Sequence, residues 1–476
     1  MNSDQKKDVL TGKINYRGIA FTFVFTDDEL RLMPPEDKKS VIEIEWKLKP
    51  IRTGVYTFAD PTPVDEKFII ANCNETNRKV IFLPKQGCYL RFTNSVVIID
   101  IKAIIVCKTN KQLINCIAFS CPEINYIYPT NQAFALNLYS DEFTEKGTLM
   151  LTTQNFESTT TEKQTFIVDD KEVQVHFSIN RTVSTKIYDS PLSLQSVMLF
   201  NFEATDDYDF ILRLWQIALS FIRFLCYRKN ICINDLSLFT PCDDGKNEPF
   251  GNMYIIDQDE EVEENTLRQG RYIKQIYIKG NEGKILSDIA ADSIYMRHIP
   301  DSYQNGRHIN AARFVMITAA FEWEFRRLYP NGIKKSEATI DAENKVYEAI
   351  SELVTNSRGK QKEIYKHLRR LIRSDSLQSE INQVGKDFSE IMDVFGNHLY
   401  HINNEELKYS EMGQRIAKQR NHFAHGDLDK DFIGLSLLDL MFMEYVIYAM
   451  QLRYYEVDDK NIQKSINDLF KCGMAL

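Results

Sequence analysis

The stretch YDFILRLWQIALSFIRFLC (residues 208–226) marks the point at which the sequence changes its hydrophobic period. The stretch is apolar on nearly every face, and Thr205, Asp206 and Asp207 precede it, which are residue types that favour the start of a helix. We therefore predict a buried helix over about 206–228. The chain before it has the pattern of strands, and most of the chain after it has the pattern of helices.

The N-terminal side contains short apolar runs with the alternation that is typical of half-buried strands. SVIEIEWKLKP (40–50) alternates in this way, and TFIVDDKEVQVHFSI (165–179) is typical of a hairpin that turns at Asp169–Lys171. His176 lies opposite the apolar side of that hairpin, so we expect it on the solvent side. Further strands are expected in IAFTFVF, KVIFLP, CYLRF and SVVIIDIKAIIVC. Residues 1–190 are therefore predicted to form an antiparallel β-rich domain, a sandwich or a barrel.

The C-terminal side is predicted to be a helical bundle over 286–476, joined to the β-rich domain by a mixed connecting region over 191–285. Long helices are expected in INAARFVMITAAFEWEFRRLY (309–329), in the basic RGKQKEIYKHLRRLIR (358–373) and over the apolar segment 432–455. The fold class is therefore α+β and multidomain, with an all-α C-terminal domain.

Composition limits the classes of function. The chain has 476 residues and a formal net charge of -9, which argues against a protein that binds nucleic acid over its whole surface but leaves a local basic groove open. Nine cysteines without a CxxC pair favour reduced thiols, and the N-terminus has no apolar signal-peptide core. We expect a cytoplasmic protein with no cofactor and no metal site, because no metal-binding motif occurs.

Two apolar stretches raise the question of a membrane helix. The stretch 208–226 contains Asp209, Arg213 and Arg223, and the stretch 432–452 contains Asp439 and Glu444. Each such charge costs roughly 2.5–3.5 kcal/mol at a bilayer centre. We therefore expect both stretches to be buried helices of a protein that does not enter the membrane.

The sequence RNHFAHG (420–426) combines an arginine, an amide and a histidine between two expected helices. If one helix continued through Arg420 and His425, the two side chains would point about 140° apart. A helix that ends there would allow both to enter one cleft, and Gly426 with the following DLD favours such an end.

This pair suits the cleavage of RNA. RNA carries its own nucleophile, the 2′-hydroxyl, and a histidine titrates in the range needed to move its proton. A guanidinium stabilises the charge that develops on the phosphate through two hydrogen bonds. Such a reaction needs no metal and yields a 2′,3′-cyclic phosphate and a 5′-hydroxyl end.

Spacing alone does not establish a site. Arg415 and His422 form a second arginine–histidine pair in the same segment. The structural alternative is that Arg420 forms an ion pair at a helix end and that His425 is a hydrogen-bonded histidine between helices.

The order Arg420, Asn421, His425 between two long helices resembles the signature of the HEPN superfamily of ribonucleases, over roughly 290–476. The β-rich first part followed by such a domain is similar in layout to the ApeA family of bacterial abortive-infection proteins. The resemblance implies a dimer whose motifs face each other across a shared cleft. It further implies that Arg420 and His425 are catalytic and that Asn421 orients or contacts the phosphate.

The resemblance suggests supporting residues and partners as well. An acid on the first helix of HEPN-like folds can pair with the motif arginine, and Glu322 is the candidate here; alternatively it faces solvent beside Glu324. His422 is a further supporting candidate. The substrate implied by analogy is RNA, with the anticodon loop of tRNA as a candidate, and the N-terminal domain would sense a phage-derived trigger or restrain the nuclease.

The basic segment 358–373 is the candidate RNA-binding track, although a solvated helix face is an equally good interpretation. The residues proposed to contact RNA are Lys362, Lys366, Arg369, Arg370 and Arg373. The apolar segment 432–455 is expected to serve both as core and as the surface of a homodimer, and assembly beyond a dimer is left open.

Two other functions compete with the nuclease. The chain could be a non-catalytic HEPN module for dimerisation or nucleotide binding. It could also be a β-sandwich binding protein with a helical scaffold, in which RNHFAHG is only a turn.

Overall fold

The computed structural model describes residues 9–53, 55–75, 77–137, 150–155, 157–186, 190, 192–233, 235–243, 245–256, 271–372, 375–424 and 431–475. The chain divides into two compact units. The first comprises 1–223, 230–267 and 282–291, and the second comprises 224–229, 268–281 and 292–476. Most of the expected connecting region thus belongs to the first unit, and the boundary expected at 285–286 falls inside a helix.

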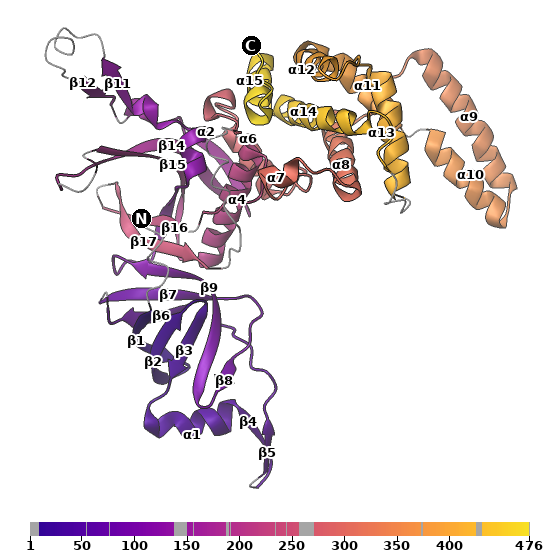
Figure 1. Cartoon of the computed structure of the whole chain (residues 1–476). Helices are drawn as coiled ribbons and strands as arrows, with labels where there is room; N and C mark the ends of the chain where they lie inside the picture. Colours follow the sequence, from indigo (N-terminus) through magenta and orange to yellow (C-terminus); the bar gives the residue numbers. More distant parts are fainter. Residues whose placement is uncertain are drawn as a thin grey trace. The chain divides into compact units, whose positions relative to one another are not determined.

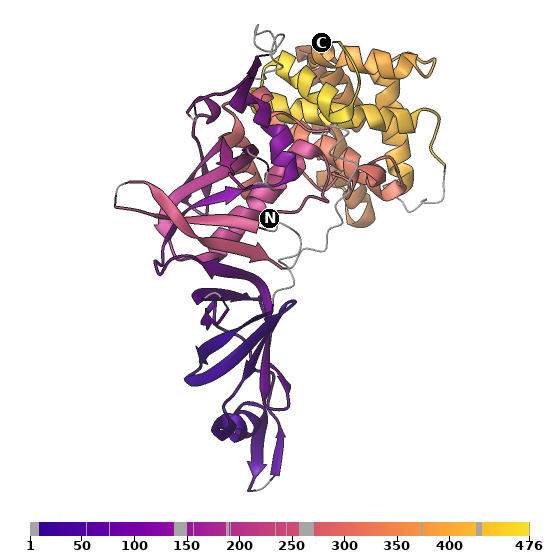
Figure 2. The same ribbon diagram turned by 60° about the vertical axis from the view of Figure 1, so that its left-hand side comes forward.

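The first unit begins with an antiparallel β-barrel (Figure 1 and Figure 2). Its strands follow the order β9-β3-β2-β1-β6-β7, and β7 pairs with β9 to close the sheet on itself, while β8 pairs with β9 alone. The strands are β1 (Leu10–Tyr16), β2 (Ile19–Thr26), β3 (Glu29–Met33), β6 (Ile69–Cys73), β7 (Arg78–Pro84), β8 (Arg91–Thr93) and β9 (Val96–Cys107).

Alternation along the strands fills the barrel. On β2, Phe21, Phe23 and Phe25 are buried while the residues between them are half-buried or exposed, and Phe23 meets Phe82 of β7 edge to face at 5.4 Å. Gly12 allows β1 and β6 to approach, because a Cβ there would lie 2.0 Å from the carbonyl oxygen of Asn72. The strands expected in IAFTFVF and KVIFLP are therefore confirmed as β2 and β7.

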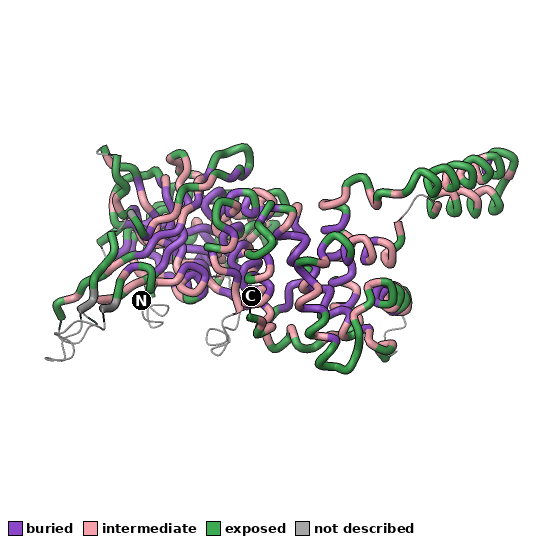
Figure 3. The backbone as a smooth tube through the Cα atoms, turned by 90° about the horizontal axis from the view of Figure 1, so that it is seen from above, coloured by how far each residue is buried: buried purple, intermediate pink, exposed green. Residues whose placement is uncertain are grey.

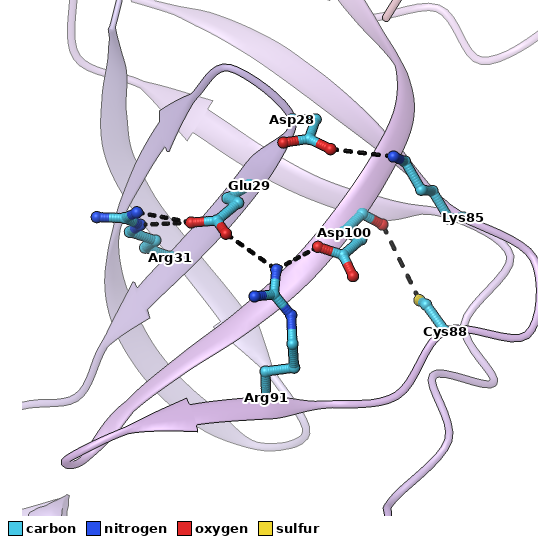
Figure 4. A network of polar contacts seen from close by, with 7 residues as sticks. All are labelled: Asp28, Glu29, Arg31, Lys85, Cys88, Arg91 and Asp100. Atoms are coloured by element: carbon cyan, nitrogen blue, oxygen red, sulfur yellow. Dashed lines mark hydrogen bonds and ion pairs between the residues drawn. The ribbon is translucent and has the colours of Figure 1, made fainter. Parts of the chain in front are cut away.

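Ion pairs tie three barrel strands together on the outside (Figure 4). Glu29 of β3 accepts hydrogen bonds from Arg31 at 2.6 Å and from Arg91 of β8 at 3.0 Å, and Arg91 also contacts Asp100 of β9. The two arginines lower the pKa of Glu29. These pairs are partly exposed, so each contributes little to stability, and they mainly fix the register of neighbouring strands.

The strand expected in 40–50 is wrong over most of its length. The chain there is helical from Glu36 to Trp46 and becomes strand β4 only at Leu48. Ile42 is buried and Trp46 packs on Tyr16 and Phe21, so the side chains that pack on the barrel are four residues apart. Alternation at every second residue includes every fourth residue, and the pattern therefore fits one face of a helix as well as a strand. The elements are η2 (Glu36–Lys38), α1 (Lys39–Val41), η3 (Ile42–Trp46), β4 (Leu48–Arg52) and β5 (Val55–Phe58).

Strand β9 continues from the barrel into a second antiparallel sheet with the order β13-β14-β15-β10-β16-β17-β9. The expected hairpin is confirmed as β13 and β14, with Asp169 and Asp170 both at positive φ in the turn. His176 lies on the face opposite Val173 and Val175, as expected, but it is half-buried there beside Asn201 at 3.2 Å, and burial lowers its pKa to about 4. The strands are β10 (Ile114–Phe119), β13 (Gln164–Val168), β14 (Lys171–Val183), β15 (Leu192–Thr205), β16 (Asp235–Pro241) and β17 (Asn247–Ile255).

The helix predicted over 206–228 is confirmed as α4 (Tyr208–Cys226), and the Asp207 side chain accepts a hydrogen bond from the backbone of Phe210 at its start. Within the part of the chain that the structure describes, no helix is long and apolar enough to span a membrane. The remaining elements of the first unit are α2 (Pro122–Ile127), η4 (Thr130–Ala133), β11 (Phe134–Asn137), β12 (Met150–Thr153), η5 (Glu157–Thr159) and α6 (Glu282–Ala290).

The second unit is helical, as the sequence predicted. Helix α14 lies at its centre, with buried residues along nearly its whole length, and packs against α8, α12, α13 and α15. The elements are η6 (Gln275–Tyr277), α7 (Tyr303–Gly306), α8 (Ala311–Leu328), α9 (Glu337–Asn356), α10 (Gly359–Ile372), α11 (Leu377–Asp387), α12 (Ser389–His401), α13 (Tyr409–Ala424), α14 (Ser436–Tyr454) and α15 (Asp459–Phe470).

Helices α9 and α10 pack mainly on each other and are exposed along most of their length (Figure 3). Val354 is the one buried side chain on α9, and α10 has none among its described residues. By contrast, α14 leaves only a few large apolar side chains exposed, including Leu437 and Met441. The apolar segment 432–455 is therefore largely core, and most of its apolar area is already covered within one chain.

Candidate functional site

Helix α13 carries the first part of the motif. Arg420, Asn421 and His422 lie in its last turns, and the helix runs to Ala424. His425 and the rest of 425–430 lie outside the described residues, as does Arg373. The helix therefore continues through Arg420 up to the residue before His425.

The residues on both sides of 425–430 are held in place by buried contacts. The side-chain oxygen of Gln419, which is fully buried, accepts hydrogen bonds from the backbone N–H of Ile433 at 2.7 Å and from the hydroxyl of Ser436. Phe423 and Phe432 meet each other at 5.6 Å, and both pack on Phe314 of α8. The chain thus enters and leaves the segment that contains His425 at neighbouring points on α8.

Arg420 forms an ion pair with Glu322 of α8. The Nη2 atom lies 3.4 Å from Oε2, and the side chains are 38% and 21% exposed. The pairing expected for the two residues is present, and Glu322 does not simply face solvent. Its neighbour Glu324 is buried instead and pairs with Arg327 at 2.6 Å. One side of the Arg420 guanidinium is thus held by a carboxylate while a substantial part remains open to solvent.

The other motif residues differ in exposure. Asn421 is exposed and His422 is half-buried, so the amide is accessible to a ligand from solvent. A carboxamide offers both a donor and an acceptor, which suits contact with a phosphate group or a sugar hydroxyl.

The second arginine of the segment is engaged differently. Arg415 forms two hydrogen bonds with Asp439 of α14, at 2.7 and 2.8 Å, and Asp439 is fully buried. The hydroxyl of Tyr400 also donates to Asp439, and burial together with the negative charge of Asp439 raises the pKa of this tyrosine. Arg415 therefore links α13 to α14 through Asp439. Arg420 differs from it because its guanidinium is more open to solvent.

A further carboxyl, that of Glu380, lies close enough to Glu322 for the two charges to interact, and no sequence motif marks it. Glu380 of α11 is buried, and one of its oxygens is buried without a hydrogen-bond partner among the described residues. Burial, together with the negative charge of Glu322, raises the pKa of Glu380 to about 7 against the opposing charge of Arg326. A group with this pKa can change charge near neutral pH. Nothing in its sequence context signals this property, because it depends on α8 and α11 coming together.

The candidate RNA-binding residues lie on α10, apart from the three helices α8, α11 and α13 that carry the groups described above. Arg370 is exposed, Lys362, Lys366 and Arg369 are half-buried, and Lys366 pairs with Glu363 at 2.9 Å. The same helix exposes Ile364, Leu368 and Leu371, so its surface is both basic and apolar.

Comparison with known proteins identifies no relative: no family model matches the chain, and neither the curated proteins nor the solved structures contain a match. The candidate site is therefore argued from its own geometry.

Proposed function

We propose that the chain is a metal-independent endoribonuclease of the HEPN type that acts in antiviral abortive infection. The ion pair between Arg420 and Glu322 is the observation that carries this proposal. In this pair the carboxylate orients the guanidinium, which is still open enough to meet a phosphate. Arg420 also lies shortly before His425 in the chain.

In the proposed reaction, His425 takes the proton from the 2′-hydroxyl, and the imidazolium so formed gives a proton to the leaving 5′-oxygen. The 2′-oxygen then attacks the adjacent phosphorus and the P–O5′ bond breaks, which leaves a 2′,3′-cyclic phosphate and a 5′-hydroxyl. Arg420 donates hydrogen bonds to the phosphate oxygens on which charge accumulates. Glu322 acts as a positioning residue, since it holds the guanidinium rather than touching the RNA.

The proposal includes a homodimer, in which the two motifs share a cleft, and an RNA track on α10. An unpaired loop, such as the anticodon loop of tRNA, is the proposed substrate because its bases can be splayed into a cleft. The β-rich unit is proposed to sense the phage-derived trigger or to restrain cleavage.

The test compares RNA from cells that express wild type, Arg420→Ala or His425→Ala, with and without phage. Denaturing gels and typing of the RNA ends should reveal discrete fragments with cyclic phosphate in the wild type alone. Equal expression of the three proteins is the control.

Intact RNA in every phage-challenged sample, with all proteins folded and dimeric, would contradict the nuclease and favour a non-catalytic HEPN module. A monomeric protein with intact RNA would instead favour a binding protein on a helical scaffold.

A further inference from the structure

A pocket of about 340 Å³ lies within the helical unit, at the start of α8. It is built from the loop around His298, from the segment before α8 and from Lys229. This volume falls within the range of small-molecule sites, near its lower end. The pocket shares α8 with Glu322 but none of its lining residues belongs to the candidate nuclease site.

The charge of the pocket favours an anion. Lys229, Arg297 and Arg313 contribute positive charge to its lining, against the single carboxylate of Asp301. Lys229 pairs with Asp301 at 3.2 Å, and Arg313 pairs with Glu444, which does not line the pocket. Arg297 is exposed and forms no ion pair or hydrogen bond with the described part of the chain.

A buried histidine with unsatisfied nitrogens lines the same pocket. His298 is 2% exposed, and neither Nδ1 nor Nε2 has a hydrogen-bond partner among the described residues. Burial, together with the positive charges of Arg313 and Lys229, lowers the pKa of His298 to about 3. The backbone of Tyr295 lies near enough to the ring to oppose this shift, although it does not meet hydrogen-bond geometry with either nitrogen. The imidazole is therefore neutral at pH 7 and offers one donor and one acceptor. Such a buried group without a partner is costly unless a ligand or water satisfies it.

The start of α8 adds further donors. The Asn310 side chain caps the helix by accepting from the backbone N–H of Arg313 at 2.9 Å. The first N–H groups of a helix, here those of Ala311 and Ala312, have no partner inside it. Together with the helix dipole, they favour a negatively charged group at this end.

We propose that this pocket binds the phosphate group of a small organic phosphate, of about the size of a mononucleotide. The phosphate is held between Arg297, the start of α8 and the N–H of His298. The organic part lies against Ile299, Pro300 and Met316, which line the same pocket. This site is independent of the proposed nuclease, so the two proposals can fail separately.

The experiment titrates the full-length protein with AMP by calorimetry, with adenosine and inorganic phosphate as comparators. Binding of AMP is expected, with inorganic phosphate weaker and adenosine undetectable up to about 10 mM. Arg297→Gln should weaken AMP binding at least about tenfold, because it removes a charge-assisted hydrogen bond. Lys460→Gln is the matched control, since Lys460 is exposed on α15 of the same unit, and should leave binding unchanged.

His298→Phe separates binding from packing. Phenylalanine keeps the ring that stacks on Tyr295 and contacts Tyr448, but it removes both nitrogens. We expect AMP binding to weaken at least about tenfold while the free energy of unfolding stays the same or rises, because an unsatisfied polar group is lost.

Four results would overturn the proposal. One is no binding of AMP or phosphate in this range, and another is equal affinity for AMP and adenosine. The third is unchanged AMP affinity in both Arg297→Gln and His298→Phe. A 5′-phosphorylated hexaribonucleotide serves as the last arm: if it binds at least tenfold more tightly than AMP, the pocket recognises an RNA end and the small-molecule proposal is wrong.

Discussion

At the scale of single residues, the two arginines of α13 have different roles that their spacing in the sequence could not reveal. Both precede a histidine, yet Arg415 faces a buried acid on α14 whereas Arg420 faces a partly exposed acid on α8. Which acid each arginine meets depends on the rotation of α13 against its neighbours. Only the resemblance to a known signature pointed to Arg420, and it also suggested Glu322 as its partner.

Arg415→Ala should destabilise the helical unit strongly. The substitution leaves the Asp439 carboxylate buried without its main partner, which costs roughly 3–5 kcal/mol. Arg420→Ala breaks a partly exposed pair and should cost at most about 1 kcal/mol. Urea unfolding followed by helical circular dichroism measures both. Similar losses in the two variants would show that Arg415 is not the structural member of the pair.

Glu322→Gln tests the positioning of Arg420. We expect RNA cleavage to fall about tenfold through kcat, with little change in stability, because the amide holds the guanidinium less firmly than the carboxylate does. Arg420→Ala should abolish cleavage. Glu348→Gln, an exposed change on α9, is the control. Unaltered cleavage in Glu322→Gln would remove Glu322 from the site.

Glu380 should make the stability of the helical unit fall as the pH rises. Its folded-state pKa of about 7 lies above the ordinary value of 4.5, so the folded state binds this proton more tightly than the unfolded state does. The resulting stability is fully present below about pH 4.5 and is lost as the pH rises through 7. Glu380→Gln should remove this loss, which is on the order of a few kcal/mol by pH 8. Urea unfolding at pH 5 and pH 8 measures it, and parallel curves for wild type and variant would contradict the assignment.

At the scale of elements, the sequence predicted long helices well because a period near 3.6 repeated over several turns is hard to mistake. It failed at Glu36–Trp46, where a short run fits both a strand and a helix and where packing of Ile42 and Trp46 on the barrel decides. The sequence also suggested that the apolar segment 432–455 serves as both core and dimer surface. The pattern of one sequence cannot separate these roles, because it does not show how much of a helix is covered by the rest of its own chain.

Helix α10 offers an element-scale test of RNA binding. Changing Lys362, Lys366, Arg369 and Arg370 to glutamine should weaken RNA binding and reduce the slope of log K against log salt by up to about 3, or roughly 0.7 for each lost phosphate contact. Fluorescence anisotropy at several salt concentrations measures this slope. A quadruple change that leaves the slope intact would make α10 a solvated face, or a protein contact through its exposed leucines.

At the scale of the whole molecule, the two units are not consecutive in the chain. The helical unit includes 224–229 and 268–281, which precede the start of its main segment at residue 292. The hydrophobic period of a sequence indicates where helices and strands lie. It does not indicate which later helices a short segment will pack against. The sequence therefore placed a boundary at 285–286, inside α6, and separated these segments from the helices that they stabilise.

A fragment that begins at residue 286 should be less stable than the same helices in the full chain. It lacks Phe224, which stacks on Tyr448 at 5.3 Å, and Tyr277, whose hydroxyl donates to Asp468 at 3.0 Å. It also lacks Tyr227, whose hydroxyl donates to Glu444. Loss of one buried aromatic side chain costs roughly 3–5 kcal/mol, so these losses together rival the stability of a domain. Hydrogen exchange should be faster in α14 of the fragment than in α14 of the full chain, while the exposed α10 exchanges alike in both. Equal protection of α14 would mean that 292–476 folds without the earlier segments, and the boundary read from the sequence would then be close to the true limit of an independent domain.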